Sequence, residues 1–392
     1  MIFQDNHIKI FSKKPLGQNS SMSKKIKVAI DIRDLRIAKT GAKTYLEEIC
    51  KEFRKGHADF TFCFIDTWLP AYTGNNKLLK TIEHIRFFSW KQFSLPVICL
   101  IRGCDILYCT DYFLPLFKYN FKTAVVFYDA FFWEYPDHYN KLWLALLNTI
   151  GVSAAKKADA IITISEYSKK QIVKHVGMEP EKIHAIHLAP KSSTRQLNLQ
   201  DARTGHTKKY ILHIGVLEKR KNLLNLIKAF QLLVQDGFEE YCLVLVGNIV
   251  SKTKIDDSGN IHKLIASSGL QGKVILPGFI SDEQLAFYYK NASLYTFVSI
   301  NEGFGLPILE AFQNNLPTLI SNNSCLPEVG GDAVIMCDPF DEYDIKNKMK
   351  MIIQDKALQN ELIEKGNKRL ALFSWQKTSD QLLDVFRNIL TN

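Results

Sequence analysis

Short apolar, β-rich runs alternate with helix-like stretches along most of the chain. A buried run at 27–32 predicts a strand, and after a turn expected at 40–42 the apolar spacing of 45–53 predicts a helix. Ser165 stands where an N-cap belongs, ahead of a helix expected over 166–175. Further strands are expected at 60–65, 106–109, 123–128 and 160–164. Strands that alternate with helices pair in parallel, so the pattern predicts an α/β fold.

A polar segment separates this series from a second one. Residues 191–207 contain few apolar side chains and are typical of a linker. The strands expected after it lie at 210–216, 242–246, 274–276, 294–299 and 318–321. The helices expected between them lie at 222–235, 262–267, 281–291 and 307–313.

Two α/β domains follow from this organisation. Residues 26–190 and 208–374 are the expected domains, and residues 1–25 are expected to be a loose leader. The amphipathic stretch at about 375–392 is expected to form a helix that packs back on the first domain. Two such domains place a cleft between the carboxyl ends of their strands, where ligands of such folds bind.

The composition is that of a globular protein, with 46% hydrophobic and 23% charged residues among 392. Eight cysteines include no C-x-x-C pair and no arrangement with histidines at zinc spacing, so they are expected to be reduced thiols. No apolar stretch reaches the roughly 18–20 residues that span a bilayer, and the N-terminus has no apolar segment of a secretory signal. These features predict a cytoplasmic protein.

The net charge of +10 lies entirely in the first half of the chain. Residues 1–200 carry 29 Lys and Arg against 18 Asp and Glu, whereas residues 201–392 carry 21 against 22. Such an excess could attract nucleic acid, an anionic membrane surface or a phosphorylated substrate. No zinc finger, RNP motif or basic heptad region occurs, so we expect no nucleic-acid partner. A solvated basic surface without any partner is the alternative.

One segment with candidate chemistry follows the strand expected at 294–299. Two glycines shape a tight loop, and Pro307 is expected at the first helical position, so free backbone amides at the helix start form an anion site. Glu302 and Glu310, eight residues apart, can both face the cleft. Because carboxylates repel phosphate, their expected partners are hydroxyls of a sugar or ribose. The alternative is a well-capped helix whose acidic residues are favoured by its dipole.

A second segment follows the strand that ends at Gly215. Its basic turn, 219–221, precedes a helix on the same edge of the sheet. Arg220 and Lys221 could clamp a diphosphate, with Arg supplying a fork of donors and Lys a point charge. The alternative is a solvated basic turn.

Together the two segments resemble the retaining GT-B glycosyltransferases of family 4, in the bacterial polysaccharide and mannosyltransferase-like branch. Glu302 and Glu310 match the E-x7-E signature of that family, and residues 218–222 resemble its E-x-R-K-N motif. Residues 277–283 resemble its base-side loop, and residues 326–329 a later landmark. The similarity extends from Lys27 to about Phe386.

The resemblance implies two Rossmann-like domains facing across a cleft, and it implies roles for residues. Arg220 and Lys221 would hold the donor diphosphate, Glu310 the nucleotide ribose, and Glu302 with the amides of 303–306 the transferred sugar. The candidate catalytic residues are Asp129, Arg220, Lys221 and Glu302. The candidate donor-binding residues are Gly41, Gly215, Arg220, Lys221, Gly247, Phe279, Ile280, Glu302, Gly303, Phe304, Gly305, Leu306 and Glu310.

The resemblance also implies a reaction. No D-x-D motif lies beside a strand end and no covalent nucleophile is obvious, which agrees with a metal-independent transfer that retains anomeric configuration. The expected donor is a GDP- or UDP-linked hexose, with mannose favoured, and no cofactor or metal is expected. The expected acceptor is a saccharide or lipid-linked saccharide in cell-surface polysaccharide synthesis.

Three positions depart from the family pattern. Lys43 stands where a second glycine is common, Val216 where an Arg is common, and Tyr128 where many members have a His before the Asp that matches Asp129. Lys43 could supply the positive charge that Val216 does not, or be a surface lysine. The alternatives for the whole chain are a GT-B epimerase or phosphorylase, or a non-catalytic subunit that binds a sugar nucleotide.

Aromatic and lysine residues mix at 87–93 and 113–122. With the basic first half, they predict a platform for an anionic membrane and a lipid-linked acceptor, which would make the protein peripheral at the inner face of the membrane. The alternative is an aromatic core with lysines that extend to its surface.

Overall fold

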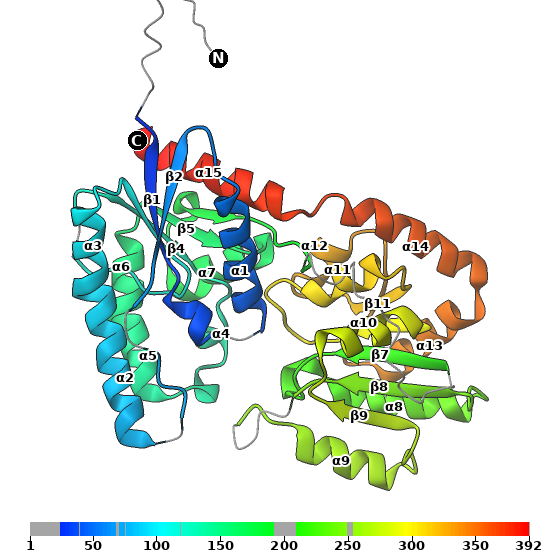
Figure 1. Cartoon of the computed structure of the whole chain (residues 1–392). Coiled ribbons are helices and arrows are strands. Elements are labelled where there is room, and N and C mark those ends of the chain that lie inside the picture. The colour runs from blue at the N-terminus through cyan, green and yellow to red at the C-terminus, as the bar shows by residue number, and fades with distance from the viewer. Residues whose placement is uncertain are drawn as a thin grey trace, which may run out of the picture.

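Two parallel six-stranded sheets, each in its own domain, form the framework of the molecule (Figure 1). The computed structural model describes residues 24–38, 40–67, 70–74, 76–117, 119–191, 209–248 and 254–391. The predicted leader and linker lie almost wholly outside the described residues. The predicted α/β fold with two domains is confirmed.

The N-terminal sheet has the strand order β2-β1-β3-β4-β5-β6. Its strands are β1 (Ile26–Asp31), β2 (Phe60–Ile65), β3 (Ile106–Cys109), β4 (Lys122–Val126), β5 (Ala160–Thr163) and β6 (Ile183–Ala185). The helices of this domain are α1 (Thr40–Arg54), α2 (Lys77–Ser89), α3 (Leu95–Ile101), α4 (Phe131–Glu134), α5 (Lys141–Leu146), α6 (Ser153–Lys156) and α7 (Glu166–Val176).

Both faces of this sheet are covered, as parallel sheets require. Alternate side chains of β1 point to opposite faces, so Val28 and Ile30 join one core and Ala29 the other. Helix α1 covers the first face, and α3, α6 and α7 cover the second.

The C-terminal sheet has the strand order β12-β11-β10-β7-β8-β9. Its strands are β7 (Lys209–Ile214), β8 (Tyr241–Val246), β9 (Val274–Gly278), β10 (Leu294–Phe297), β11 (Thr318–Ser321) and β12 (Ile335–Cys337). Its helices are α8 (Leu223–Gln235), α9 (Ser258–Ser267), α10 (Asp282–Asn291), α11 (Leu306–Gln313), α12 (Leu326–Gly330), α13 (Glu342–Gln354) and α14 (Lys356–Leu370). The order reverses between β7 and β10, and ligands of such sheets bind at the carboxyl ends of the strands at this point.

The last helix, α15 (Trp375–Thr391), leaves the C-terminal domain and returns to the first (Figure 1). It packs on α1, and the rings of Tyr108 and Phe386 meet edge-to-face at 5.3 Å. The indole of Trp375 donates a hydrogen bond of 2.9 Å to the carbonyl of Pro190. The core of the first domain is therefore built from both ends of the chain.

Two local predictions were wrong. Residues 40–42 do not form a turn but the first turn of α1, because Gly41 and Ala42 adopt helical backbone there. Pro307 occupies the second position of α11 and not the first, because Gly305, with φ of 98°, is the N-cap. In the part of the chain that the structure covers, no helix is long and apolar enough to cross a membrane.

Candidate active site

A cavity of about 730 Å³ lies between the two domains, at the point where the C-terminal strand order reverses. Every candidate catalytic and donor-binding residue lines it, including Gly41 and Asp129 from the N-terminal domain and Phe279 and Ile280 from the loop after β9. Val216 and Tyr128, two of the positions that depart from the family pattern, line it as well. The structure thus brings the whole predicted set together.

The loops after β7 and β10 meet because these strands are neighbours in the sheet. The amide of Ile300 donates a hydrogen bond of 2.9 Å to the carbonyl of Arg220, which joins the two loops. Asn222, with φ of 58°, ends the basic turn and donates a side-chain hydrogen bond of 3.1 Å to the carbonyl of Val298. The sequence positions 220 and 302, far apart in the chain, are therefore held side by side.

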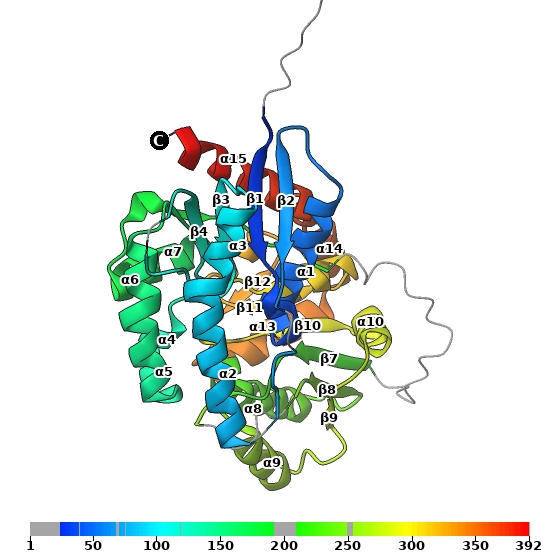
Figure 2. The same ribbon diagram turned by 60° about the vertical axis from the view of Figure 1, so that its left-hand side comes forward.

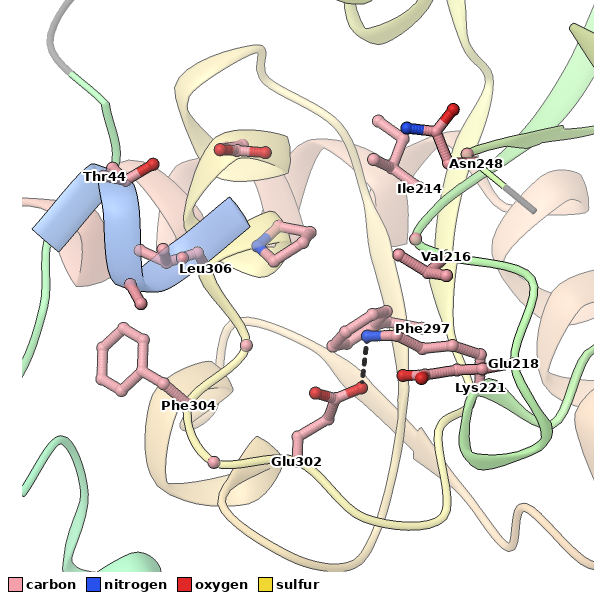
Figure 3. A pocket seen from close by; sticks show the side chains of 18 of the residues that line it. Thr44, Ile214, Val216, Glu218, Lys221, Asn248, Phe297, Glu302, Phe304 and Leu306 are labelled. Atoms are coloured by element: carbon pink, nitrogen blue, oxygen red, sulfur yellow. Dashed lines mark hydrogen bonds and ion pairs between the residues drawn. The ribbon is translucent and has the colours of Figure 1, made fainter. Parts of the chain in front are cut away.

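Glu302 is the centre of an ion-pair cluster in the cavity. Its carboxylate lies 2.6 Å from the Lys221 ammonium (Figure 3). It also lies 2.5 Å from the Arg220 guanidinium. Arg220 also pairs with Glu218, and donates a hydrogen bond of 2.8 Å to the carbonyl of Asn301. Both cations are thus engaged by carboxylates.

Burial and charge act in opposite directions in this cluster. Burial opposes ionisation of Glu302, but the charges of Arg220 and Lys221 outweigh it and lower the Glu302 pKa to about 2. Burial lowers the pKa of Lys221 below its usual value, although Glu302 opposes this. Burial also disfavours the charge on Arg220, but the carboxylates of Glu302 and Glu218 outweigh it and raise the guanidinium pKa. Glu302 is therefore an ionised carboxylate held between two cations.

Glu310 lies one turn into α11 and is separate from this cluster. Its carboxylate accepts a hydrogen bond of 2.7 Å from the hydroxyl of Tyr289, which comes from α10. Burial raises the pKa of Glu310, although the Tyr289 hydrogen bond opposes this shift. Nothing in the sequence pattern pointed to Tyr289, because only the packing of α10 on α11 makes the contact.

The N-terminal wall contributes Asp129, which follows β4. Burial raises its pKa to about 6, although the amide of Phe131 and the charge of Arg220 oppose the shift. The hydroxyl of Tyr112 lies 3.4 Å from the Asp129 carboxylate. A Cβ added to Gly303 would lie 3.4 Å from the Cβ of Asp129, so the two domains approach closely here.

Gly247 is required by a close approach of two loops. A Cβ at this position would lie 1.8 Å from the carbonyl oxygen of Gly215, which no side chain can tolerate. Gly247 therefore allows the carboxyl ends of β7 and β8 to pack closely against each other where they line the cavity.

Two sequence hypotheses are corrected here. Lys43 does not line the cavity but pairs with Glu47 at 3.7 Å on the exposed side of α1, so it is a surface lysine and does not replace the missing Arg. Lys91, placed in the membrane platform, is 1% exposed and pairs with Asp31 and Asp111 inside the first domain. Phe87, Phe88 and Phe113 are mutually packed at 5.3–5.5 Å as part of the core. Within these segments Phe87, Phe88, Lys91 and Phe113 therefore belong to the core, whereas Phe93 and Phe117 are exposed.

Sequence reasoning missed the contacts that join the domains. Asn301 donates a hydrogen bond of 3.1 Å to the hydroxyl of Tyr135, and another to Glu134. Glu328, in the landmark segment 326–329, accepts hydrogen bonds of 2.8 and 3.1 Å from the amides of Glu166 and Tyr167 at the start of α7. Each of these contacts links the two domains. The local sequence pattern does not predict such pairs, because their members are far apart in the chain.

No cluster of three or more potential metal ligands occurs within the ranges that the structure covers.

Comparison with known proteins identifies both halves of the chain. Residues 195–369 match the family model of the glycosyl transferases group 1, and residues 40–189 match the model of glycosyltransferase family 4. The O-antigen chain mannosyltransferase B of Escherichia coli is 28% identical over 272 residues, which are 68% of this chain and 70% of that protein. The serotype-specific mannosyltransferase WbdA of Escherichia coli is 30% identical over 243 residues, which are 60% of this chain but only 29% of WbdA.

Solved structures share the architecture. The structure of Alr3699/HepE from Anabaena, in complex with UDP, matches with a TM-score of 0.65 at 16% identity, over 93% of this chain and 100% of that one. At this level of identity the likeness concerns the fold. Since the two family models together account for most of the chain, the protein belongs to the glycosyl transferases of group 1 and has the GT-B fold.

Proposed function

We propose that this protein transfers a hexose, with mannose favoured, from a nucleoside-diphosphate sugar to a saccharide or lipid-linked saccharide, with retention and without a metal ion. The observation that carries the proposal is the meeting of Arg220, Lys221 and Glu302 in the interdomain cavity, with Glu310 on the adjacent helix. Mannose is favoured because mannosyltransferases of O-antigen chains are among the relatives. The proposed setting is cell-surface polysaccharide synthesis at the inner face of the membrane.

In this proposal the two cations bind the donor diphosphate. Negative charge grows on the departing phosphate as the glycosidic bond breaks, and preorganised cations stabilise that charge more than they stabilise the ground state. Arg220 presents a fork of donors and Lys221 a compact charge, and both are held in place by Glu302 before the donor arrives.

The carboxylates bind hydroxyl groups. Glu310 would accept a hydrogen bond from the ribose, and Glu302 from the sugar, each while keeping its present partner. The acceptor hydroxyl would attack on the same face as the leaving diphosphate and transfer its proton to the departing phosphate oxygen. Contact between Gly303 and the N-terminal domain would keep water from this position.

The test is a transfer assay with GDP-mannose, UDP-glucose and ADP-glucose and a short mannoside acceptor. We expect nucleoside diphosphate to be released from GDP-mannose only when acceptor is present, and a product that has the α configuration by NMR. No release from any donor despite donor binding would favour the non-catalytic alternative, and release at the same rate without acceptor would show hydrolysis of the donor in place of transfer.

Metal independence needs its own assay. We expect EDTA to leave the rate unchanged, because Arg220 and Lys221 can balance the charge of the diphosphate in place of a metal ion. Loss of the rate in EDTA and recovery with Mn²⁺ or Mg²⁺ would contradict this part of the proposal.

A further inference from the structure

A second, smaller cavity lies in the N-terminal domain, beside the cavity between the domains. Its volume is about 190 Å³, about a quarter of that of the larger cavity. Ala42, Tyr112 and Tyr128 line both cavities, so the two adjoin along these side chains. The remaining lining residues are Asp34, Ala38, Leu46, Thr110 and Asp111. We call this cavity the acidic pocket, because two carboxyl groups line it.

The acidic pocket lies where the strand order of the N-terminal sheet reverses. The chain adds β2 on one side of β1 and β3 on the other, so β1 lies between them (Figure 2). Asp34 follows β1, Asp111 follows β3 and Tyr128 follows β4. Ligands of open parallel sheets bind at the carboxyl ends of the strands at such a reversal. The position of the acidic pocket is therefore that of a ligand site.

Each of the two carboxyl groups has a buried oxygen atom without a hydrogen-bond donor. When both groups are ionised, no donor among the described residues reaches Asp34 Oδ1 or Asp111 Oδ2. Arg33 Nη1 lies 3.8 Å from Asp34 Oδ1, which is too far for a hydrogen bond. Buried polar atoms of this kind are unfavourable and rare. A ligand that donates hydrogen bonds in the pocket would satisfy both.

A buried lysine holds the carboxyl group of Asp111. Lys91 is 1% exposed, and its ammonium lies 2.5 Å from Asp111 Oδ1 and 2.6 Å from Asp31. Asp31 in turn accepts hydrogen bonds of 3.2 and 3.3 Å from the indole of Trp90. The Asp111 side chain is only 10% exposed, so it is fixed with one oxygen on Lys91 and the other without a partner.

Tyr112 belongs to the wall of both cavities and has a strained backbone. Its φ of 65° lies in the left-handed region, which a bulky residue rarely adopts. Its hydroxyl lies 3.4 Å from the Asp129 carboxylate and accepts a hydrogen bond of 3.3 Å from the Asp129 amide. Strained residues cluster at ligand sites. Tyr112 thus connects the acidic pocket with a candidate catalytic residue.

We propose that the acidic pocket binds one sugar ring of the acceptor saccharide, with two ring hydroxyls donating hydrogen bonds to Asp34 Oδ1 and Asp111 Oδ2. The proposal rests on the proposed function, because it names the groups that recognise that acceptor. The hydroxyls of a sugar lie on neighbouring carbons, so one ring can reach two carboxyl groups that lie close together. The volume limits the ligand to a small group such as one ring.

Two other ligands fit the acidic pocket less well. A Ca²⁺ or Mg²⁺ ion takes about six or more oxygen ligands, whereas no group of three or more potential metal ligands occurs in the described ranges. Burial raises the pKa of Asp34 and of Asp111, although Lys91 opposes both shifts. A carboxyl pair that keeps one proton donates as well as accepts, which suits a hydroxyl, whereas an ammonium ion only donates.

The experiment measures acceptor binding directly, by calorimetric titration of the full chain with a methyl mannobioside in the presence of GDP. The pocket variants are Asp34→Asn, which removes one carboxylate, and Ala38→Leu, which narrows the pocket and keeps both carboxyl groups. The matched control is Asp66→Asn. Asp66 follows β2 in the same sheet, pairs with Arg36 at 2.7 Å and lines neither cavity.

We expect the full chain and the control to bind the mannobioside equally, and each pocket variant to bind it about tenfold more weakly or worse. Binding of GDP should be the same in every protein, because Arg220 and Lys221 lie in the other domain. In the transfer assay the pocket variants should raise the KM for the acceptor and leave the KM for the donor unchanged.

A set of monodeoxy mannobiosides shows whether Asp34 touches the sugar. One analogue should bind the full chain about as weakly as the parent sugar binds Asp34→Asn. With Asp34→Asn this analogue should lose no further affinity, because both changes remove the same hydrogen bond. Losses that add for every analogue would contradict the contact.

Equal binding by the pocket variants and the control, or no binding of the mannobioside by the full chain, would overturn the proposal. So would stronger binding of an amino analogue than of its hydroxyl parent, since the pocket would then take an ammonium ion. If no protein transfers sugar but the pocket variants still weaken mannobioside binding, the proposed function is contradicted and the assignment of the pocket stands.

Discussion

At the scale of single residues, Glu302 is the buried anion that Arg220 and Lys221 share. Glu302→Gln should lower the free energy of unfolding by on the order of 3 kcal/mol, because Arg220 and Lys221 lose a buried charged partner. The same change should make GDP or UDP bind more tightly, because the negative charge of Glu302 no longer partly neutralises these cations or repels the diphosphate. Thermal unfolding with and without nucleoside diphosphate measures both effects.

Two variants make this result interpretable. Glu361→Gln, which removes an exposed partner of Lys365, should change neither quantity. Lys221→Ala should weaken nucleoside diphosphate binding, which is the opposite effect. Unchanged nucleoside diphosphate binding in Lys221→Ala would show that the diphosphate does not lie against these cations.

Asp129 gives a prediction on pH. Its pKa rises from the usual 3.8 to about 6 because the folded protein disfavours its charge. The folded state therefore binds the proton more tightly than the unfolded state, and the stability that Asp129 contributes is lost as pH rises from about 4 to about 6. Relative to Asp129→Asn, the native protein should lose up to about 3 kcal/mol of its free energy of unfolding over this range. Urea unfolding of both proteins from pH 4 to 7 tests this prediction. If the free energies of unfolding of the two proteins follow parallel curves against pH, the prediction is wrong.

At the scale of elements, α11 depends on a glycine with positive φ. Gly305 is its N-cap with φ of 98°, and an added Cβ would lie 3.0 Å from Leu326 and 3.2 Å from Ile308. Gly305→Ala should therefore destabilise the protein by about 1–3 kcal/mol, and should also weaken nucleotide-sugar binding because the loop amides shift. Calorimetric titration with the preferred donor measures the second effect.

Gly269→Ala is the control for Gly305→Ala. Gly269 also has positive φ, 67°, but an added Cβ meets no atom within 4 Å and the residue does not line the cavity. It should reduce stability without changing donor affinity. Equal donor affinity in both variants would show that the α11 amides do not contact the donor.

Helices and strands whose pattern of hydrophobic residues matches their burial in the fold could be predicted from the sequence. The strand expected at 318–321 is β11, and the N-cap Ser165 lies where its residue type placed it. Glu302 and Glu310 could be assigned to one cleft because their loop and helix follow a buried strand. These features depend on local chemistry, which a single sequence contains.

The rest depends on contacts between distant segments. No helix was expected at α2 or α3, because charges on their inner face and apolar side chains on their outer face reverse the usual pattern. The pairing of Glu302 with Arg220 and Lys221 requires the order of strands in the sheet, which sequence spacing does not determine. Lys91 was placed on a surface since its two carboxylate partners are 20 and 60 residues away.

At the scale of the whole molecule, Glu328 holds the two domains together. Its carboxylate caps the first turn of α7 across the domain boundary and lies 2.7 Å from His187. Burial disfavours the charge of Glu328, but His187 and the two amides outweigh it and lower its pKa. Charge-assisted hydrogen bonds of this kind contribute about 1.5–3 kcal/mol each, so they favour the closed arrangement of the domains.

Glu328→Ala should therefore open the cleft without unfolding either domain. We expect a larger radius of gyration by small-angle X-ray scattering and faster amide exchange at Glu166 and Tyr167. Transfer should slow about tenfold or more if the closed arrangement loses about 1.4 kcal/mol of stabilisation. Nucleoside diphosphate binding should be retained, because Arg220 and Lys221 lie in one domain. Glu364→Ala, an exposed surface partner of Lys368, is the control, and identical exchange at α7 in both variants would contradict this role for Glu328.

The return of α15 to the first domain ties folding to the order of synthesis. Leu382 and Phe386, near the end of the chain, are fully buried in a core whose first strand begins at Ile26. A nascent chain on the ribosome cannot complete its first domain until α15 has emerged, so this domain closes only after the second one has been synthesised. A product that ends before Trp375 leaves this core open to water and exposed to chaperones and proteases, whereas a chain that includes α15 conceals it.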